Sequence, residues 1–117
     1  KFVTIQVMAI RPATDLNRFG VLSIEDDGKC ANFEFLDEDH TLGNALRHML
    51  LKDVEVRFCG YASPHPNERR ITFQVQVYKG TAIDALERGL RNLRDLNSHV
   101  KSVLSKEYQA IQNSGCP

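Results

Sequence analysis

The side chains best suited to chemistry in this chain are an acidic run, Asp37, Glu38 and Asp39, followed by a histidine. A general acid and base usually face each other across a cleft, whereas these carboxylates are consecutive and precede a helical pattern. Asp39 or Thr41 can accept hydrogen bonds from the free N–H groups of a first helical turn, and acidic groups suit the positive end of the helix dipole. The spacing therefore favours helix capping over acid–base catalysis.

The other reactive residues also lack a catalytic or metal-binding pattern. Cys30, Cys59 and Cys116 are an odd number without C-x-x-C spacing, which argues against a disulfide framework and a zinc knuckle and suits a reducing compartment. Nothing in the sequence requires His40 to meet a cysteine as a base would. His65 lies between two prolines, and no phosphate loop, nucleophile elbow or His-x-x-x-His pattern occurs. We therefore expect no catalytic, cofactor-binding or metal-binding residues.

Composition restricts the possible partners. The 15 basic and 15 acidic residues cancel, so no net field favours direct binding to nucleic acid or anionic lipid. No apolar run approaches the length of a membrane span. The 117 residues suit one domain with one core. We expect an N-terminal extension at residues 1–18, of which 2–10 could form a strand, and a single α+β domain at 19–117.

The first two predicted strands form a hairpin. Asp27-Gly28 is a two-residue loop of the kind that favours a type I′ turn. Counting outward from it pairs Ile24 with Ala31 and Leu22 with Phe33 on the apolar face. Ser23, Glu25, Asn32 and Cys30 then share the polar face.

Two further segments alternate with period two, as expected of half-buried strands. In the first, Val54, Val56 and Phe58 share one face, and Cys59 and Tyr61 share the other. In the second, the apolar face consists of Ile71, Phe73, Val75 and Val77. The sequence predicts about four antiparallel strands whose apolar face is covered by two helices.

The first helix follows the acidic run. Leu42, Ala45, Leu46, Met49 and Leu50 recur at helical spacing and make one apolar face. The second helix begins near Thr81 and carries a longer stripe. Its apolar positions include Leu86, Leu90, Leu93, Leu96, Val100, Val103, Leu104 and Ile111.

This second helix should be longer than the domain that carries it. About 30 residues at ~1.5 Å each reach ~45 Å, whereas a compact domain of this size is roughly 35 Å across, with a radius of gyration near 13 to 14 Å. Leaving Val100, Val103 and Leu104 in water would forfeit about 1.5 to 3 kcal/mol per side chain. We therefore expect a partner to cover them. Gly89 within the stripe indicates a close approach, which we expect to be that of another backbone.

The segment from His40 to Arg47, His-Thr-Leu-Gly-Asn-Ala-Leu-Arg, resembles the signature of the alpha-type subunits of cellular RNA polymerases. The order of elements from about Phe19 to Ile111 is similar to that of the small eukaryotic and archaeal members. Within the family, Glu55-Val-Arg-Phe-Cys-Gly-Tyr61 and the following His-Pro-x-Glu segment look most similar to the small subunit shared by RNA polymerases I and III.

The resemblance implies a non-catalytic assembly subunit in the nucleus, including the nucleolus. It would heterodimerise with a larger alpha-like subunit through both helices, and the heterodimer would then bind the large catalytic subunits. The interface residues implied on the first helix are Thr41, Leu42, Gly43, Asn44, Ala45, Leu46 and Arg47. Those expected on the second are Leu86, Leu90, Leu93, Leu96, Val100, Val103 and Leu104.

Three alternatives stay open at this point. The chain could be the equivalent small subunit of another nuclear or archaeal RNA polymerase. It could pair with a second copy of itself. It could also be a free-standing α+β domain that binds a small molecule or catalyses a reaction near His40 or Cys59, which would require an apolar pocket with convergent polar groups and a strongly perturbed titratable residue.

Overall fold

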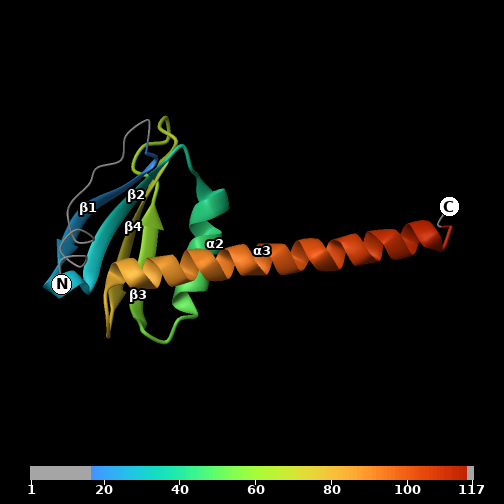
Figure 1. The fold of residues 1–117 in the computed structure, drawn as a ribbon. Coiled ribbons are helices and arrows are strands. Elements are labelled where there is room, and N and C mark those ends of the chain that lie inside the picture. The colour runs from blue at the N-terminus through green and yellow to red at the C-terminus, as the bar shows by residue number, and fades with distance from the viewer. Residues whose placement is uncertain (1–16, 116–117) are drawn as a thin grey trace.

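The computed structural model describes residues 17–115; the predicted strand at 2–10, most of the predicted extension and Cys116 lie outside them. One four-stranded antiparallel sheet, in the order β1-β2-β4-β3, packs against two helices (Figure 1). The elements in chain order are β1 (Phe19–Glu25), a 3-10 turn (Asp26–Gly28), β2 (Cys30–Leu36), α2 (His40–Leu51), β3 (Val56–Ala62), β4 (Arg70–Val77) and α3 (Ala82–Asn113). The predicted fold class is therefore confirmed.

One apolar cluster joins the sheet to both helices. β4 contributes Ile71, Phe73, Val75 and Val77, all at most 5% exposed, as the period-two pattern predicts. Residues from both helices belong to the same cluster, so both helices cover the same face of the sheet. The helical members are Leu46 and Leu50 of α2 and Ala82, Ala85 and Leu86 of α3.

The β1–β2 hairpin follows the prediction near its turn and departs from it further away. Asp27 and Gly28 both have positive φ, as a type I′ turn requires, and Ile24 pairs with Ala31. Beyond Ser23 the register shifts, so Val21, not Leu22, lies opposite Phe33. The predicted Leu22 pairing is wrong because an irregularity in β1 places one extra residue there; Val21 is buried and Leu22 is exposed.

The third strand also differs from its predicted pattern. Val54 is 89% exposed because residues 52–55 form turns, with the N–H of Val56 donating to the Asp53 carbonyl, and β3 begins only at Val56. A register shift between Val56 and Phe58 then turns Phe58 away from the core and places Cys59 in it. The predicted common face of Val54, Val56 and Phe58 is therefore wrong.

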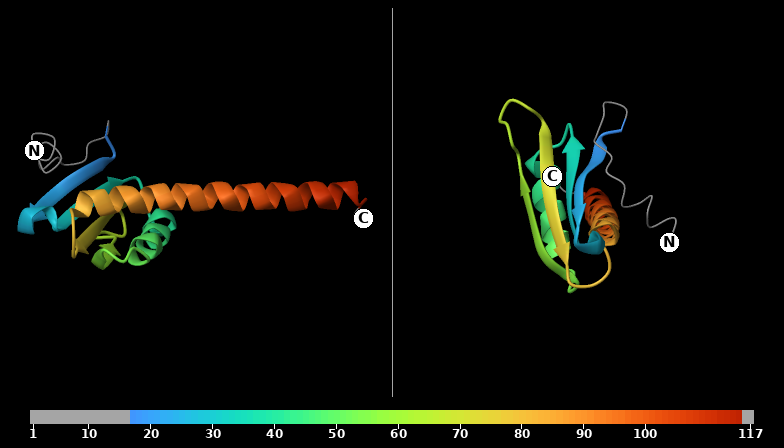
Figure 2. Two further views of the ribbon diagram at one scale, coloured as in Figure 1. Left: turned by 60° about the horizontal axis from the view of Figure 1, so that its bottom comes forward. Right: turned by 90° about the vertical axis from the view of Figure 1, so that its left-hand side faces the viewer.

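The long helix α3 extends far beyond the sheet, as predicted. Its 32 residues correspond to about 48 Å at ~1.5 Å per residue. The radius of gyration is 17.6 Å, well above the roughly 13 to 14 Å of a compact domain of this length. Figure 2 shows the C-terminal half of α3 leaving the body of the domain without any neighbouring element.

Candidate protein-binding surface

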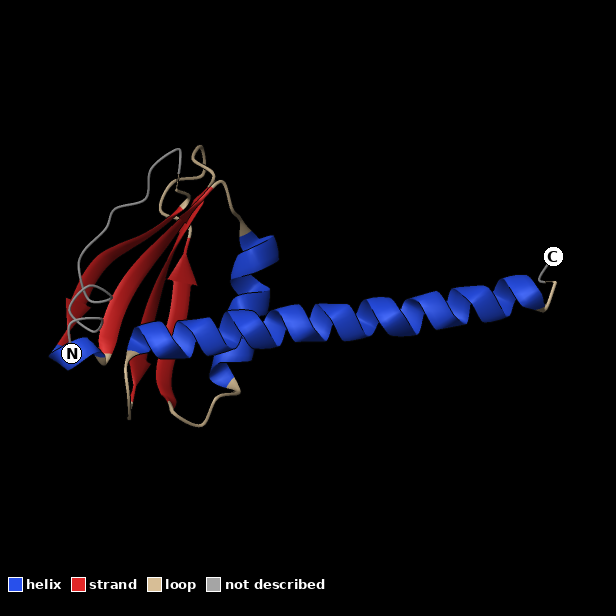
Figure 3. Cartoon of the chain, in the orientation of Figure 1, coloured by secondary structure: helices blue, strands red, loops and turns tan. Residues whose placement is uncertain are grey.

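The free half of α3 carries an apolar stripe that the described chain does not cover. Every residue from Arg94 to Asn113 is exposed, and Figure 3 shows this half of the helix standing clear of the sheet. Among residues 17–115, eleven large hydrophobic residues are exposed, and six of them lie on this half, with exposures of 43 to 67%. They are Leu96, Val100, Val103, Leu104, Tyr108 and Ile111. At about 100° per residue, all but Tyr108 fall within roughly 100° of the helix circumference.

The residues predicted to contact a partner divide into three groups. Gly43, Leu46 and Leu86 are buried within this chain's own core, so they support the surface without forming it. The partly buried residues, at the edge of the core, are Leu42, Ala45, Leu90 and Leu93. The exposed residues are Thr41, Asn44 and Arg47 on α2 and Leu96, Val100, Val103 and Leu104 on α3.

Helix α2 is held at its first turn by Tyr61 of β3. The Tyr61 hydroxyl lies 2.8 Å from His40 Nδ1, and its ring stacks on Phe73 with centroids 5.4 Å apart. Gly43 lies against the same ring, where a Cβ would approach Tyr61 Cε2 to 2.5 Å. The glycine and histidine of the α2 signature therefore form one packed unit with the tyrosine of β3.

The acidic run before α2 has a structural role. The Asp39 carboxylate accepts a hydrogen bond from the Thr41 N–H at 2.9 Å and pairs with Arg69 at 3.4 Å. The pKa of Asp39 is lowered, first by the bond from the Thr41 N–H. Asp37 lies 3.2 Å from Arg18 and 3.8 Å from Arg69. Of the two predicted capping residues, Asp39 is therefore the one that caps the helix, and the ion pairs of Asp37 and Asp39 join the helix start to neighbouring loops.

Cys59, one of the residues considered for a catalytic role, lies buried in the core. Burial raises the pKa of the Cys59 thiol to about 11, only partly offset by Arg47, so the nucleophilic thiolate is suppressed at neutral pH. Among residues 17–115, no three His, Cys, Asp or Glu side chains form a group that could hold a metal ion. No helix in that part of the chain is long and apolar enough to cross a membrane.

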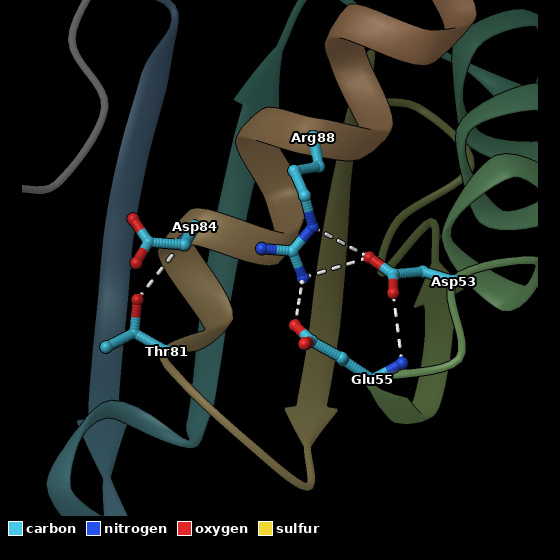
Figure 4. A network of polar contacts seen from close by, with 5 residues as sticks. All are labelled: Asp53, Glu55, Thr81, Asp84 and Arg88. Atoms are coloured by element: carbon cyan, nitrogen blue, oxygen red, sulfur yellow. Dashed lines mark hydrogen bonds and ion pairs between the residues drawn. The ribbon is translucent and has the colours of Figure 1, made fainter.

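A network of charged residues fixes the base of α3 against the loop before β3 (Figure 4). Arg88 lies 2.9 Å from the Asp53 carboxylate and 3.1 Å from that of Glu55, and Asp53 also accepts a hydrogen bond from the Glu55 N–H at 3.0 Å. Thr81 caps the helix by accepting from the Asp84 N–H at 3.2 Å. These contacts set the direction in which the free half of α3 projects.

The close approach at Gly89 occurs within the chain. A Cβ at Gly89 would lie 2.7 Å from Leu50 Cδ2 and 3.5 Å from Leu46 Cδ1, so the glycine lets α3 cross α2. The expectation of another backbone at this position is wrong; the neighbour is a leucine side chain of α2. The predicted contact residues do not include Glu107 or the exposed Tyr108, although the same three- and four-residue steps lead to both.

The sequence matches the model of a known protein family. The family model described as the RNA polymerase Rpb3/Rpb11 dimerisation domain matches residues 30–103, from the start of β2 through most of α3. The chain therefore belongs to the RNA polymerase Rpb3/Rpb11 dimerisation-domain family.

The similar proteins include subunits of RNA polymerases I and III from several organisms. The chain is 44% identical over 87 residues to the DNA-directed RNA polymerases I and III subunit RPAC2 of Saccharomyces cerevisiae, covering 74% of this chain and 61% of that protein. It is 41% identical over 92 residues to subunit rpc19 of the same polymerases in Dictyostelium discoideum, covering 78% of each chain. For RPAC2 of Danio rerio the identity is 47% over 93 residues, covering 76% of this chain and 82% of that one.

A solved structure shares the fold. DNA-directed RNA polymerase subunit L of Thermoplasma acidophilum superposes with a TM-score of 0.69 at 27% identity, covering 81% of this chain and 92% of that one. The match extends the family assignment from the sequence to the arrangement of sheet and helices.

Proposed function

We propose that this chain is the small alpha-like subunit of RNA polymerases I and III and that it heterodimerises with a larger alpha-like subunit. The names of the relatives support the choice of polymerases, and the family description supports a role in dimerisation. The domain that pairs is residues 19–117. The resulting heterodimer would bind the large catalytic subunits, so the chain would act in the nucleus, including the nucleolus, without an active site or nucleic-acid contact of its own.

The observation that carries the proposal is the uncovered stripe on the free half of α3. Each Leu or Val that moves fully from water into a packed environment contributes about 1.5 to 3 kcal/mol. The exposed Leu96, Val100, Val103 and Leu104 together would forfeit several kcal/mol if they stayed in water. A partner helix packed along this stripe would recover that energy. The exposed Thr41, Asn44 and Arg47 of α2 are further contact residues in the proposal.

Purification from cells tests the assignment to particular polymerases. We expect the tagged full chain, isolated under native conditions, to yield by mass spectrometry one larger alpha-like subunit together with the largest subunits of polymerases I and III. Recovery of the polymerase II catalytic subunits instead would reassign the chain to that enzyme. Recovery of no polymerase subunit would contradict the proposal.

Co-expression tests the pairing itself. We expect the chain alone to self-associate or precipitate, and the chain with the larger alpha-like subunit to sediment as a one-to-one complex. A chain that is a stable monomer alone and gains nothing from co-expression would show that the stripe needs no partner. A stable self-paired dimer that excludes the larger subunit would support self-association instead.

A further inference from the structure

Glu107 interrupts the apolar stripe of α3. Seven residues make two helical turns less about 20°, so residues seven apart lie almost in line along the helix. Leu86, Leu93, Val100 and Glu107 form such a series. Its first three members are apolar, and the stripe continues past Glu107 to Ile111, which is 50% exposed. A carboxylate therefore lies in line with the residues proposed to pack against a partner.

The carboxylate borders an apolar concavity. A shallow hollow on the free half of α3 is lined by His99, Val100, Val103, Leu104 and Glu107. Within residues 17–115, the Glu107 side chain makes no ion pair or hydrogen bond. Its neighbours within one turn on the stripe side, Val103, Leu104 and Ile111, offer no positive charge. Among the described residues, none within one turn of Glu107 on the stripe carries a positive charge, so a cation that faces it there would come from the partner.

Covering the hollow would remove water from Glu107. A buried carboxylate without a partner is strongly unfavourable, so an entirely apolar partner helix would lose much of what it gains from the valines and leucine. An arginine or lysine avoids this loss because its aliphatic stem can lie on apolar residues while its charged end reaches a carboxylate. One such side chain would cover the apolar lining of the hollow and pair with the Glu107 carboxylate.

Glu107 also bears on self-association. In a parallel pair of α3 helices, equivalent positions of the stripe face each other, so two Glu107 carboxylates would meet. Such like-charge contacts at a core position disfavour the pairing, whereas a cation on a different chain favours it. In that parallel arrangement, Glu107 would favour a partner helix that carries a cation over a second copy of this chain.

We propose that Glu107 determines partner specificity and that the partner helix places an arginine or lysine over Val100 and Leu104 with its charge on the Glu107 carboxylate. The inference rests on the proposed heterodimer. Beyond the heterodimer, it specifies the kind of partner side chain that lies beside one position of the stripe.

The test measures the affinity of the full chain for the co-expressed larger alpha-like subunit with Glu107→Gln, Glu107→Arg and Glu107→Leu. We expect binding about tenfold weaker for glutamine, which keeps the size but loses the charge, and about a hundredfold weaker for arginine. Asp95→Asn and Asp95→Arg make the same kinds of change at an exposed carboxylate about 120° round the helix, and should bind as the wild type does. Circular dichroism checks that every variant keeps its helix content.

Two outcomes would overturn the inference while leaving the heterodimer intact. In the first, Val100→Asp abolishes binding, but all Glu107 variants bind like the wild type, so no cation contacts the carboxylate. In the second, Glu107→Leu binds more tightly than the wild type, which would show an apolar partner at this position. A wild-type chain that does not bind the larger subunit at all would overturn both the heterodimer and the inference.

Discussion

The ring of Tyr61 lies over Gly43, so that a Cβ on the glycine would come within 2.5 Å of Tyr61 Cε2. The ring cannot easily retreat, because it stacks on Phe73 behind it and its hydroxyl contacts His40. This contact fixes the first turn of α2 on the sheet and explains why the helix has a glycine on its buried face.

Replacing this glycine should destabilise the domain. Gly43→Ala gains about 1 kcal/mol of helix propensity but forces the methyl group into the ring, and such overpacking typically costs about 1 to 3 kcal/mol. We expect a net loss of about 1 kcal/mol in the free energy of unfolding, measured by urea denaturation. Asn44→Ala, which also introduces alanine but at the exposed next position, should not lower the free energy of unfolding.

A double substitution separates steric overlap from other effects. Tyr61→Val removes the ring. Adding Gly43→Ala to this variant should therefore no longer destabilise the domain, and should instead raise its free energy of unfolding through the higher helix propensity of alanine. If Gly43→Ala costs the same free energy with and without the tyrosine, the ring does not set the requirement for glycine.

Because the Cys59 thiol is buried, the free energy of unfolding should fall as the pH rises into the alkaline range. Burial raises the pKa of Cys59 from its ordinary value near 9.0 to about 11, so the folded state disfavours the thiolate. The contribution of the neutral Cys59 thiol to the free energy of unfolding is fully present below pH 9 and is lost as the pH rises through 11. A shift of this size corresponds to about 2 to 3 kcal/mol as an upper limit.

Comparison with Cys59→Ala isolates this contribution from other groups that titrate in the same range. We expect the free energy of unfolding of the wild type to fall more steeply than that of the alanine variant between pH 9 and 11. Parallel curves for the two proteins would show that the thiol is not held in its neutral form by the fold.

The Arg88 network should stabilise the base of α3. Arg88→Ala leaves Asp53, whose side chain is only 16% exposed, without its cation, while the second acceptor, Glu55, is more exposed. We expect a loss of about 1 to 2 kcal/mol in thermal or chemical unfolding, partly reduced at high salt. Arg91→Ala breaks an exposed pair with Glu87 one helical turn apart and should cost about 0.5 kcal/mol or less. Equal losses for the two variants would contradict a special role for the network.

Regular periodicity made much of the fold predictable. The alternation of β4 and the three- and four-residue steps of both helices identify their buried faces without reference to distant residues, and the helix length follows from the same count. These elements follow from local spacing, because the side-chain directions of a regular strand or helix are fixed by its geometry.

The errors fell where the backbone is irregular. The register shifts at Leu22 and Arg57 invert the expected face of Leu22 and of Phe58, and no local spacing in these two strands marks the shifts. The sequence predicts a close approach at Gly89, but only the packing of α3 on α2 identifies Leu50 as the neighbour. Leu86 likewise belongs to the same stripe as Val100, and its burial depends on where the sheet ends.

The pairing of α3 with a larger alpha-like subunit is tested most directly by adding charge to the stripe. Val100→Asp with Leu104→Asp places two carboxylates among exposed apolar residues, whereas Ser98→Asp with Ser102→Asp adds the same two charges to the other side of the same helix. We predict that the wild type and the serine variant co-purify with the larger subunit and that the Val100 and Leu104 variant does not, although circular dichroism shows it folded. Retention of the larger subunit by that variant would contradict the account.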